Sequence, residues 1–441
     1  MLAHWLLDTD TFANPESLST FQKDLPLEWI EEVLEKTHKA SIRKRKLPAE
    51  LVVWLVIGMG LFRDRSITDI VSKLDLHLSD SLGDNVAPSA IPQARQRLSD
   101  EPLAELFSMT ARHWGKQEDS DDKWNNLKLF SIDGTQLRCH DTPEHVASFG
   151  YINYSKDKHT EYPIVRLCAL TSLRSRIIHD AAFGPSFTGE ISYAKTLTRS
   201  AQDSSLTIFD RCYLSAELMI NWHRKNTDCH WLTPIKSNTK YDIIEELGEG
   251  DYIVEMAVSA HARKQDPSLP ERWKARLVLY PESNQPNHIK GLLSSLVEFE
   301  MYPAEQIRDV YFERWEIECG YGEIKHQMLE DSVLLRSLST VGVNQEIWGI
   351  LMAYNLIRVE ISRIAKEANV SPLRISFVMA MRDIQDELLW CAMGTPGSIP
   401  KKLRAMRERV KRYILPEKRK RPKNRSVRIS KTRYLVQSKH P

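Results

Sequence analysis

The sequence lacks the features of several common protein classes. Its longest nearly uncharged apolar run covers only residues 51–62, whereas a helix that spans a bilayer needs about 20 apolar residues. The first residues have no basic region before an apolar segment, so they do not predict a secretory signal peptide. A phosphate-binding P-loop motif is also absent, so ATP use is not indicated. We therefore expect a cytoplasmic protein with no membrane partner.

Cysteine is scarce as well. The 441 residues include six cysteines and no C-x-x-C pair, which argues against a disulfide scaffold and against a cysteine zinc site. We expect reduced and mostly buried thiols. The hydrophobic content of 42% and charged content of 27% are typical of a chain that folds as two or three globular domains.

The net charge of +2 hides a strong asymmetry along the chain. Residues 401–441 hold 17 lysines or arginines against two acids, a net charge of +15, so the preceding 400 residues carry −13. Such a basic stretch is typical of segments that bind polyanions without sequence preference. Nucleic acid is the expected partner, and the alternative is a solvated extension that aids solubility.

The first region of the chain has the apolar spacing of helices. Near its end, residues 87–98 predict a short helix rich in side chains that can read a DNA groove, which would suit a helix-turn-helix reader. A solvated amphipathic helix fits the same pattern. The side chains in question are Gln93, Arg95, Gln96 and Arg97, of which Gln93 and Arg97 are our candidates for DNA contact.

Strand-like runs begin near residue 127 and follow a recognisable order. Three early strands, then helix, strand, helix and strand predict the α/β fold of a ribonuclease-H-like mixed sheet. We therefore expect five regions. They are a helical DNA-end-binding domain at 1–120, the first part of the catalytic core at 121–236, a β-rich insertion at 237–302, a long helix opened by Pro303 and further helices at 303–395, and a basic tail at 396–441.

Two acids lie where strands of this sheet are predicted to end. Asp133 follows one strand and Asp210 follows a neighbouring one, so their carboxylates can converge. Carboxylate oxygens are ligands that Mg²⁺ takes, and two such ions can stabilise both the attacking and the leaving oxygen in phosphoryl transfer. For either aspartate alone, a turn or capping role is the more common explanation.

The predicted long helix supplies a third acid. At 100° per residue, Arg314, Glu318 and Lys325 fall within about 60° of Tyr311 on one face. A carboxylate between two cations and a phenol suits a metal ion held beside a phosphate. The other acids of this helix, Glu313, Glu316 and Glu323, fall away from that face.

These residues resemble the signature of the insertion element 4 type of DDE transposases. The signature is Y-(2)-R-(3)-E-(6)-K, matched by Tyr311, Arg314, Glu318 and Lys325, and its two other acidic blocks resemble the segments at 133–135 and 210–215. The similarity extends to 43–48, 87–98 and 346–358.

The resemblance implies a function as well as a fold. It implies a ribonuclease-H-like core with a β insertion, and a bacterial, nucleoid-associated enzyme that excises and integrates an insertion sequence by cut-and-paste transposition. Hairpin ends, catalysis by Asp133, Asp210 and Glu318 with two Mg²⁺ ions (Mn²⁺ substituting), and a homodimer on paired terminal inverted repeats are also implied. Double-stranded DNA would contact Tyr311, Arg314 and Lys325. A nuclease without strand transfer and a transposase-derived DNA-binding regulator are the alternatives.

The sequence departs from the family pattern at one position. The glycine common after Asp-Arg in the second acidic block is Cys212 here, which leaves the carboxylate of Asp210 in place. Members of the family also use a tryptophan of the insertion to handle a flipped DNA base. Trp273 is the only tryptophan between Trp231 and Trp315, but no local motif assigns that role to it.

Overall fold

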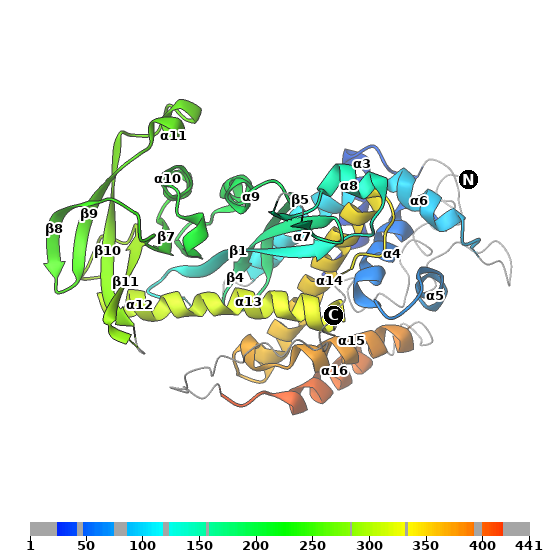
Figure 1. The fold of residues 1–441 in the computed structure, drawn as a ribbon. Coiled ribbons are helices and arrows are strands. Elements are labelled where there is room, and N and C mark those ends of the chain that lie inside the picture. Colours follow the sequence, from blue (N-terminus) through cyan, green and yellow to red (C-terminus); the bar gives the residue numbers. More distant parts are fainter. Residues whose placement is uncertain are drawn as a thin grey trace, which may run out of the picture.

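The computed structural model describes residues 24–41, 47–74, 86–117, 123–155, 158–282, 285–330, 334–391 and 399–417. Figure 1 shows an elongated molecule with the β-rich insertion at one end and the N-terminal helices at the other. Within the described part of the chain, none of the helices has the length and apolar character needed to cross a membrane.

One mixed sheet forms the centre of the molecule, in the order β5-β4-β1-β6-β7-β11-β10-β9-β8 (Figure 1). Strands β5, β4 and β1 run antiparallel, whereas β1, β6 and β7 run parallel. This is the predicted ribonuclease-H-like order. The strands are β1 Lys128–Arg138, β4 Ile164–Ser172, β5 Ile178–Pro185, β6 Ser205–Phe209, β7 Cys229–Pro234, β8 Asp242–Gly248, β9 Asp251–Ala257, β10 Arg272–Glu282 and β11 Gln285–Ser294.

The insertion extends the core sheet instead of forming a second one. Strand β11 pairs with β7, and β10, β9 and β8 follow outward as antiparallel neighbours. Strand β8 was not predicted, because nearly all of its side chains are exposed and it lacks an apolar alternation. The short helix α11 (Ala260–Gln265) joins β9 to β10.

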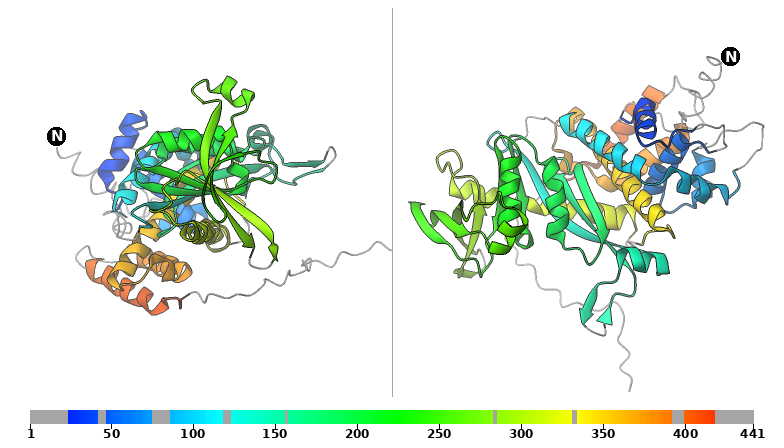
Figure 2. Two further views of the ribbon diagram at one scale, coloured as in Figure 1. Left: turned by 90° about the vertical axis from the view of Figure 1, so that its left-hand side faces the viewer. Right: turned by 90° about the horizontal axis from the view of Figure 1, so that it is seen from above.

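Helices cover both faces of the sheet (Figure 2). Helices α9 and α10 pack on one face, and the segment from α12 to η5 runs along the other (Figure 1). A short helix and a two-stranded hairpin between β1 and β4 were not predicted. The unpredicted elements are α8 Pro143–Phe149, β2 Asn153–Ser155 and β3 Lys158–His159. The other helical elements of this part of the chain are α9 Glu190–Leu197, η2 Thr198–Ser200, η3 Arg211–Tyr213, α10 Ala216–Lys225, α12 Ala304–Tyr311, η4 Phe312–Arg314, α13 Trp315–Gly322 and the π-helix η5 Glu323–Met328.

The N-terminal helices share a core with the C-terminal ones. Helix α4 is buried along nearly its whole surface, because residues 51–62 are apolar on every side. It packs against α14, and α7 reaches β5. The helices concerned are α3 Leu27–Lys36, α4 Ala49–Leu61, α5 Ile67–Lys73, α6 Ala90–Leu98, α7 Glu101–Gln117, α14 Thr340–Glu367, η6 Pro372–Arg374, α15 Phe377–Cys391, α16 Ile399–Val410 and η8 Lys411–Tyr413.

The basic tail does not behave as one segment. Its beginning forms helix α16, which was not predicted, and two arginines of this helix pair with acids of α14 and α15. Arg407 Nη1 lies 2.8 Å from Glu367, and Arg409 Nε lies 2.8 Å from Asp383. These cations are therefore used inside the fold. Residues 418–441, which hold ten of the 17 cations of the tail, lie outside the described residues.

Two glycines allow α4 and α14 to cross closely. A Cβ at Gly349 would lie 2.4 Å from the backbone oxygen of Val56, and one at Gly60 would lie 2.7 Å from the backbone oxygen of Gly349. A side chain at either position would force two backbones apart, because neither neighbour is a flexible side-chain end.

We expect Gly349→Ala to lower the free energy of unfolding by about 2 kcal/mol, because overpacking outweighs the gain in helix propensity. Gly322→Ala is the control, since the nearest atom to its Cβ would be 3.7 Å away on His326. Denaturant titrations of both variants would check this. Equal stability of Gly349→Ala and the wild type would contradict the close crossing.

Candidate active site

The two predicted aspartates lie next to each other at the end of the β1–β6 pair. The parallel pairing ends at Ile132 and Phe209, so Asp133 and Asp210 are the next residue on each side. Each carboxylate accepts a hydrogen bond from the following backbone amide, at 2.8 and 2.7 Å respectively. Asp133 does not end its strand as predicted, because β1 continues to Arg138 by pairing with β4.

The segment that holds the other four predicted residues is not a uniform α-helix. Helix α12 begins after Pro303 as predicted, but a 3₁₀ turn (η4) and a π-helical turn (η5) flank α13. We call residues 304–328 the rod (Figure 1). Tyr311 ends α12, Arg314 ends η4, and Glu318 and Lys325 lie in α13 and η5. The spacing of 100° per residue therefore does not hold along the whole rod.

Arg314 nevertheless connects the rod to the two aspartates. Its Nη2 donates a hydrogen bond to Glu318 Oε1 at 2.7 Å, and its Nη1 lies 3.9 Å from Asp133 Oδ2. The guanidinium also hydrogen-bonds the Tyr311 side chain, and Asp210 lies within electrostatic reach. Glu318, Asp133 and Tyr311 thus lie next to the side chain of Arg314, with Asp210 within electrostatic reach of it.

The electrostatics of the site reflect its burial. Burial raises the pKa of Asp133 to about 6, and the negative charges of Asp210 and Glu190 add to this effect while Arg314 opposes it. Burial also lowers the pKa of Lys325, which the nearby Asp133 partly counters. For Arg314 burial disfavours the charge, but Tyr311 and the acids outweigh it and raise the guanidinium pKa.

The opposite side of the rod is fixed by buried charges. Glu316 and Glu323 point away from the aspartates, as predicted, and both pair with Arg176 from the turn between β4 and β5. Glu323 also pairs with Arg358 of α14 and accepts a hydrogen bond from Tyr354 Oη at 2.9 Å. This cluster joins the rod to both the sheet and the helical core.

One residue that was not predicted from the sequence, Tyr321, connects the rod to β1 by a hydrogen bond. The buried Tyr321 donates a hydrogen bond from its hydroxyl to the backbone oxygen of Asp133 at 2.6 Å. Its position three residues after Glu318 places it on the same side of α13, which is the only signal in the sequence that could have indicated it.

Helix α6 separates its polar side chains into two groups. Gln93 and Arg97 are exposed, as a DNA-reading role requires. Arg95 is not, because its guanidinium is buried against α14 and lies 3.0 Å from both Gln345 and Ser337. Of the four polar side chains that we noted on this helix, Arg95 is therefore not available to read a DNA groove.

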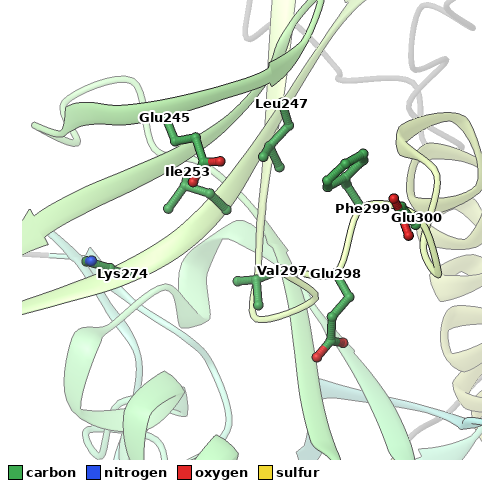
Figure 3. A pocket seen from close by; sticks show the side chains of 8 residues that line it. All are labelled: Glu245, Leu247, Ile253, Lys274, Val297, Glu298, Phe299 and Glu300. Carbon is green, nitrogen blue, oxygen red and sulfur yellow. The ribbon is translucent and has the colours of Figure 1, made fainter.

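Two features of the insertion do not serve a phosphate substrate. Trp273 is only 9% exposed and packs 5.5 Å from the ring of Trp231, so it belongs to the core. A pocket on the insertion (Figure 3) is lined mainly by acidic and apolar side chains, which disfavours an anion. The lining residues are Glu245, Leu247, Ile253, Lys274, Val297, Glu298, Phe299 and Glu300.

The acids at the β1–β6 edge fit a divalent cation in chemistry. They offer only oxygen donors, and repulsion between Asp133 and Asp210 is the kind of interaction that a cation relieves. Among the described residues, however, no three His, Cys, Asp or Glu side chains converge closely enough to hold a metal ion. The guanidinium of Arg314 engages Glu318 and faces Asp133 at this place.

Comparison with known families defines the class of the protein. A model described as "Transposase DDE domain" matches residues 124–356, more than half of the chain, and "Insertion element 4 transposase N-terminal" matches residues 15–108. With the mixed sheet, these matches identify a DDE transposase, an enzyme that cleaves DNA and transfers its strands. Enzymes of this class generally use divalent metals.

Individual relatives narrow the assignment. "Transposase InsG for insertion sequence element IS4" of Escherichia coli (strain K12) is 33% identical over 426 residues, 96% of this chain and 95% of that protein. "Putative transposase InsZ" of the same strain is 36% identical over 232 residues, 52% and 76% of the two chains. The chain belongs to the insertion element 4 family of DDE transposases, as the signature indicated.

A solved structure is similar in outline. The piggyBac transposase synaptic complex with hairpin DNA has a TM-score of 0.42 and 12% sequence identity, covering 92% of this chain and 87% of that chain.

The raised pKa of Asp133 predicts a dependence of stability on pH. Because ionisation of Asp133 is disfavoured in the folded state, the stability of the metal-free protein falls as pH rises from about 4 through about 6. Asp133→Asn should therefore raise the free energy of unfolding by about 2 to 3 kcal/mol at pH 8 and by little at pH 4. Denaturant titrations in a chelator at both pH values would measure this.

The control is Asp309→Asn, which removes an exposed carboxylate from the same rod. It should change stability by less than about 0.5 kcal/mol at either pH. An Asp133→Asn effect that is equal at the two pH values would contradict the electrostatic account.

Proposed function

We propose that this transposase excises and integrates an insertion sequence by Mg²⁺-dependent in-line phosphoryl transfer at its terminal inverted repeats, through hairpin ends. The observation that carries the proposal is the meeting of Asp133 and Asp210 at the end of the β1–β6 pairing, with Arg314 linking Glu318 to them. These contacts support the proposal that three acids from three separate elements act together.

In this proposal Asp133, Asp210 and Glu318 are the ligands of two Mg²⁺ ions, for which Mn²⁺ substitutes. The bound cations supply activation of the attacking hydroxyl and stabilisation of the leaving oxygen. Asp133 holds its charge above pH 6, so the site is ready for a cation at neutral pH. Tyr321 holds the backbone of Asp133 against the rod.

Arg314 has a second role in this scheme. In the protein without DNA, the Arg314 guanidinium pairs with Glu318. A DNA phosphate bound here would compete with Glu318 for that guanidinium. When a phosphate takes Arg314, the Glu318 carboxylate is released toward the aspartates. Tyr311 and Lys325 flank the same phosphate. Binding of DNA and assembly of the metal site are therefore coupled.

We further propose that DNA ends are recognised by the helical region at 1–120, through the exposed Gln93 and Arg97, and that a homodimer holds two ends together. Residues 418–441 carry ten lysines or arginines and no acids, so we assign them to nonspecific DNA binding. The cations of α16 are left out of that role because two of them, Arg407 and Arg409, form ion pairs within the fold.

Replacing Glu318 with glutamine tests the proposed chemistry. Glu318→Gln should slow cleavage of the element ends by at least about 100-fold, because several kcal/mol of metal-derived stabilisation depend on that carboxylate. Binding to end DNA should remain within about threefold of the wild type. Both are measured with full-length protein, by cleavage of a labelled end and by gel shift with Mg²⁺.

Glu313→Gln is the matched control, because Glu313 lies on the same rod but pairs with Arg174 at 3.1 Å. It should cleave like the wild type. Cleavage by Glu318→Gln at the wild-type rate would remove Glu318 from the mechanism. In a supercoiled-plasmid assay, nicking without joined products would favour the nuclease alternative, and binding without any cleavage would favour the regulator.

The exposed side chains of α6 allow a separate test of sequence reading. The double variant Gln93→Ala, Arg97→Ala should reduce the preference for terminal repeats over random DNA by about 10-fold or more, while total DNA affinity falls less. Lys116→Ala, which removes one exposed cation from α7, is the control and should leave the preference unchanged. A footprint of the ends that survives in the double variant would place recognition elsewhere.

A further inference from the structure

A fourth acid, Glu190, lies against the proposed active site, and no motif in the sequence indicated it. Glu190 is the first residue of α9, the helix that follows β5, and its side chain folds back over β1. A Cβ at Gly134 would lie 2.8 Å from Glu190 Cδ and 3.1 Å from its Oε2. Only a glycine next to Asp133 leaves space for this carboxylate.

The partners of Glu190 are neutral. Its Oε2 accepts a hydrogen bond from the hydroxyl of Tyr213 at 3.3 Å and lies 3.9 Å from the thiol of Cys212. Both donors follow Asp210 in the turn η3, and the side chain of Tyr213 is fully buried. Glu190 therefore joins α9 to the two segments that hold the proposed aspartate ligands.

No cation balances this acid in the described structure. Among the described residues, no lysine or arginine forms an ion pair with Glu190, although the side chain is only half-exposed. It lies within electrostatic reach of Asp133, whose own negative neighbour is Asp210. Asp133 therefore has two acids, Asp210 and Glu190, and two cations, Arg314 and Lys325, within electrostatic reach, and a divalent ion would relieve the repulsion among the acids.

A purely structural role explains less of this arrangement. An acid in the first turn of a helix interacts favourably with the helix dipole by about 0.3 to 1 kcal/mol, wherever its side chain points. That role does not require the carboxylate to lie on the backbone of β1, nor a glycine beneath it. A role in cation binding would require negative charge at this place and so accounts for the close approach to Gly134.

We propose that Glu190 is a fourth carboxylate of the catalytic centre and contributes to binding the divalent cation held by Asp133 and Asp210. This inference rests on the proposed function, because it requires a metal site at these aspartates. The same role would explain why Gly134 and Cys212 occupy their positions, because both residues lie against the Glu190 carboxylate.

Metal binding tests the proposal independently of activity. Full-length protein bound to a duplex with an element end is titrated with Mn²⁺, and bound Mn²⁺ is followed by electron paramagnetic resonance. Glu190→Gln keeps the size of the side chain and an acceptor for Tyr213 but removes the charge. We expect Mn²⁺ affinity to fall by about 10-fold or more. Cleavage should recover at high metal concentration.

The matched control is Tyr213→Phe, which removes the hydrogen bond and leaves the charge of Glu190. Its Mn²⁺ affinity should stay within about twofold of the wild type, whereas a structural role would make the two variants alike. Gly134→Ala is a second test variant: it keeps every acid but displaces the Glu190 carboxylate, so it should also weaken Mn²⁺ binding. If Glu190→Gln does not fold, the Mn²⁺ affinity of Gly134→Ala provides the test.

The variant Asp210→Asn distinguishes a failure of the role of Glu190 from a failure of the proposed metal site itself. If Asp210→Asn loses Mn²⁺ while Glu190→Gln and Gly134→Ala bind it like the wild type, the role of Glu190 is overturned and the proposed function stands. If none of the three variants changes Mn²⁺ binding, the metal site at the aspartates is overturned together with the role of Glu190.

Discussion

The buried cluster of charges around Arg176 is the interaction on which the geometry of the site depends. Arg176 stands in the turn between β4 and β5 with a positive φ of 62°, and it pairs with Glu316 and Glu323 on the back of the rod. Arg358 of α14 completes the cluster. Because breaking a buried pair leaves an uncompensated charge, at a cost of about 3 to 5 kcal/mol, the rod has one favourable position against the sheet.

The front of the same rod has the opposite electrostatic character. There the cations are Arg314 and Lys325, and the acids come from the sheet as well as from the rod, so the proposed site holds more carboxylates than cations. The acids at the back of the rod, Glu316 and Glu323, form buried ion pairs that stabilise the fold. The acid at the front, Glu318, pairs with Arg314 and is the one assigned to the proposed chemistry. Glu318 differs from Glu316 only in the side of the rod that it occupies.

The DNA-binding elements show how far charge can be interpreted from sequence. Residues 401–441 have the composition of an extended polyanion-binding tail, yet α16 uses Arg407 and Arg409 to dock on α14 and α15. Arg95 is similar, because it lies in a polar helix but is buried against α14. In both cases the acid or carbonyl that receives the cation lies in a distant part of the chain.

The sequence by itself determined the order of the core strands, the two aspartates, and the signature that ends in Lys325. These are local properties: strand periodicity, apolar runs and the spacing of residues within one helix are set by neighbours along the chain. Only the tertiary structure decided that Arg314 stands between the acids, that Arg95 is buried, and that Glu190 lies over Gly134. These features depend on which strands and helices pack together, so the contacts join residues that no local pattern relates.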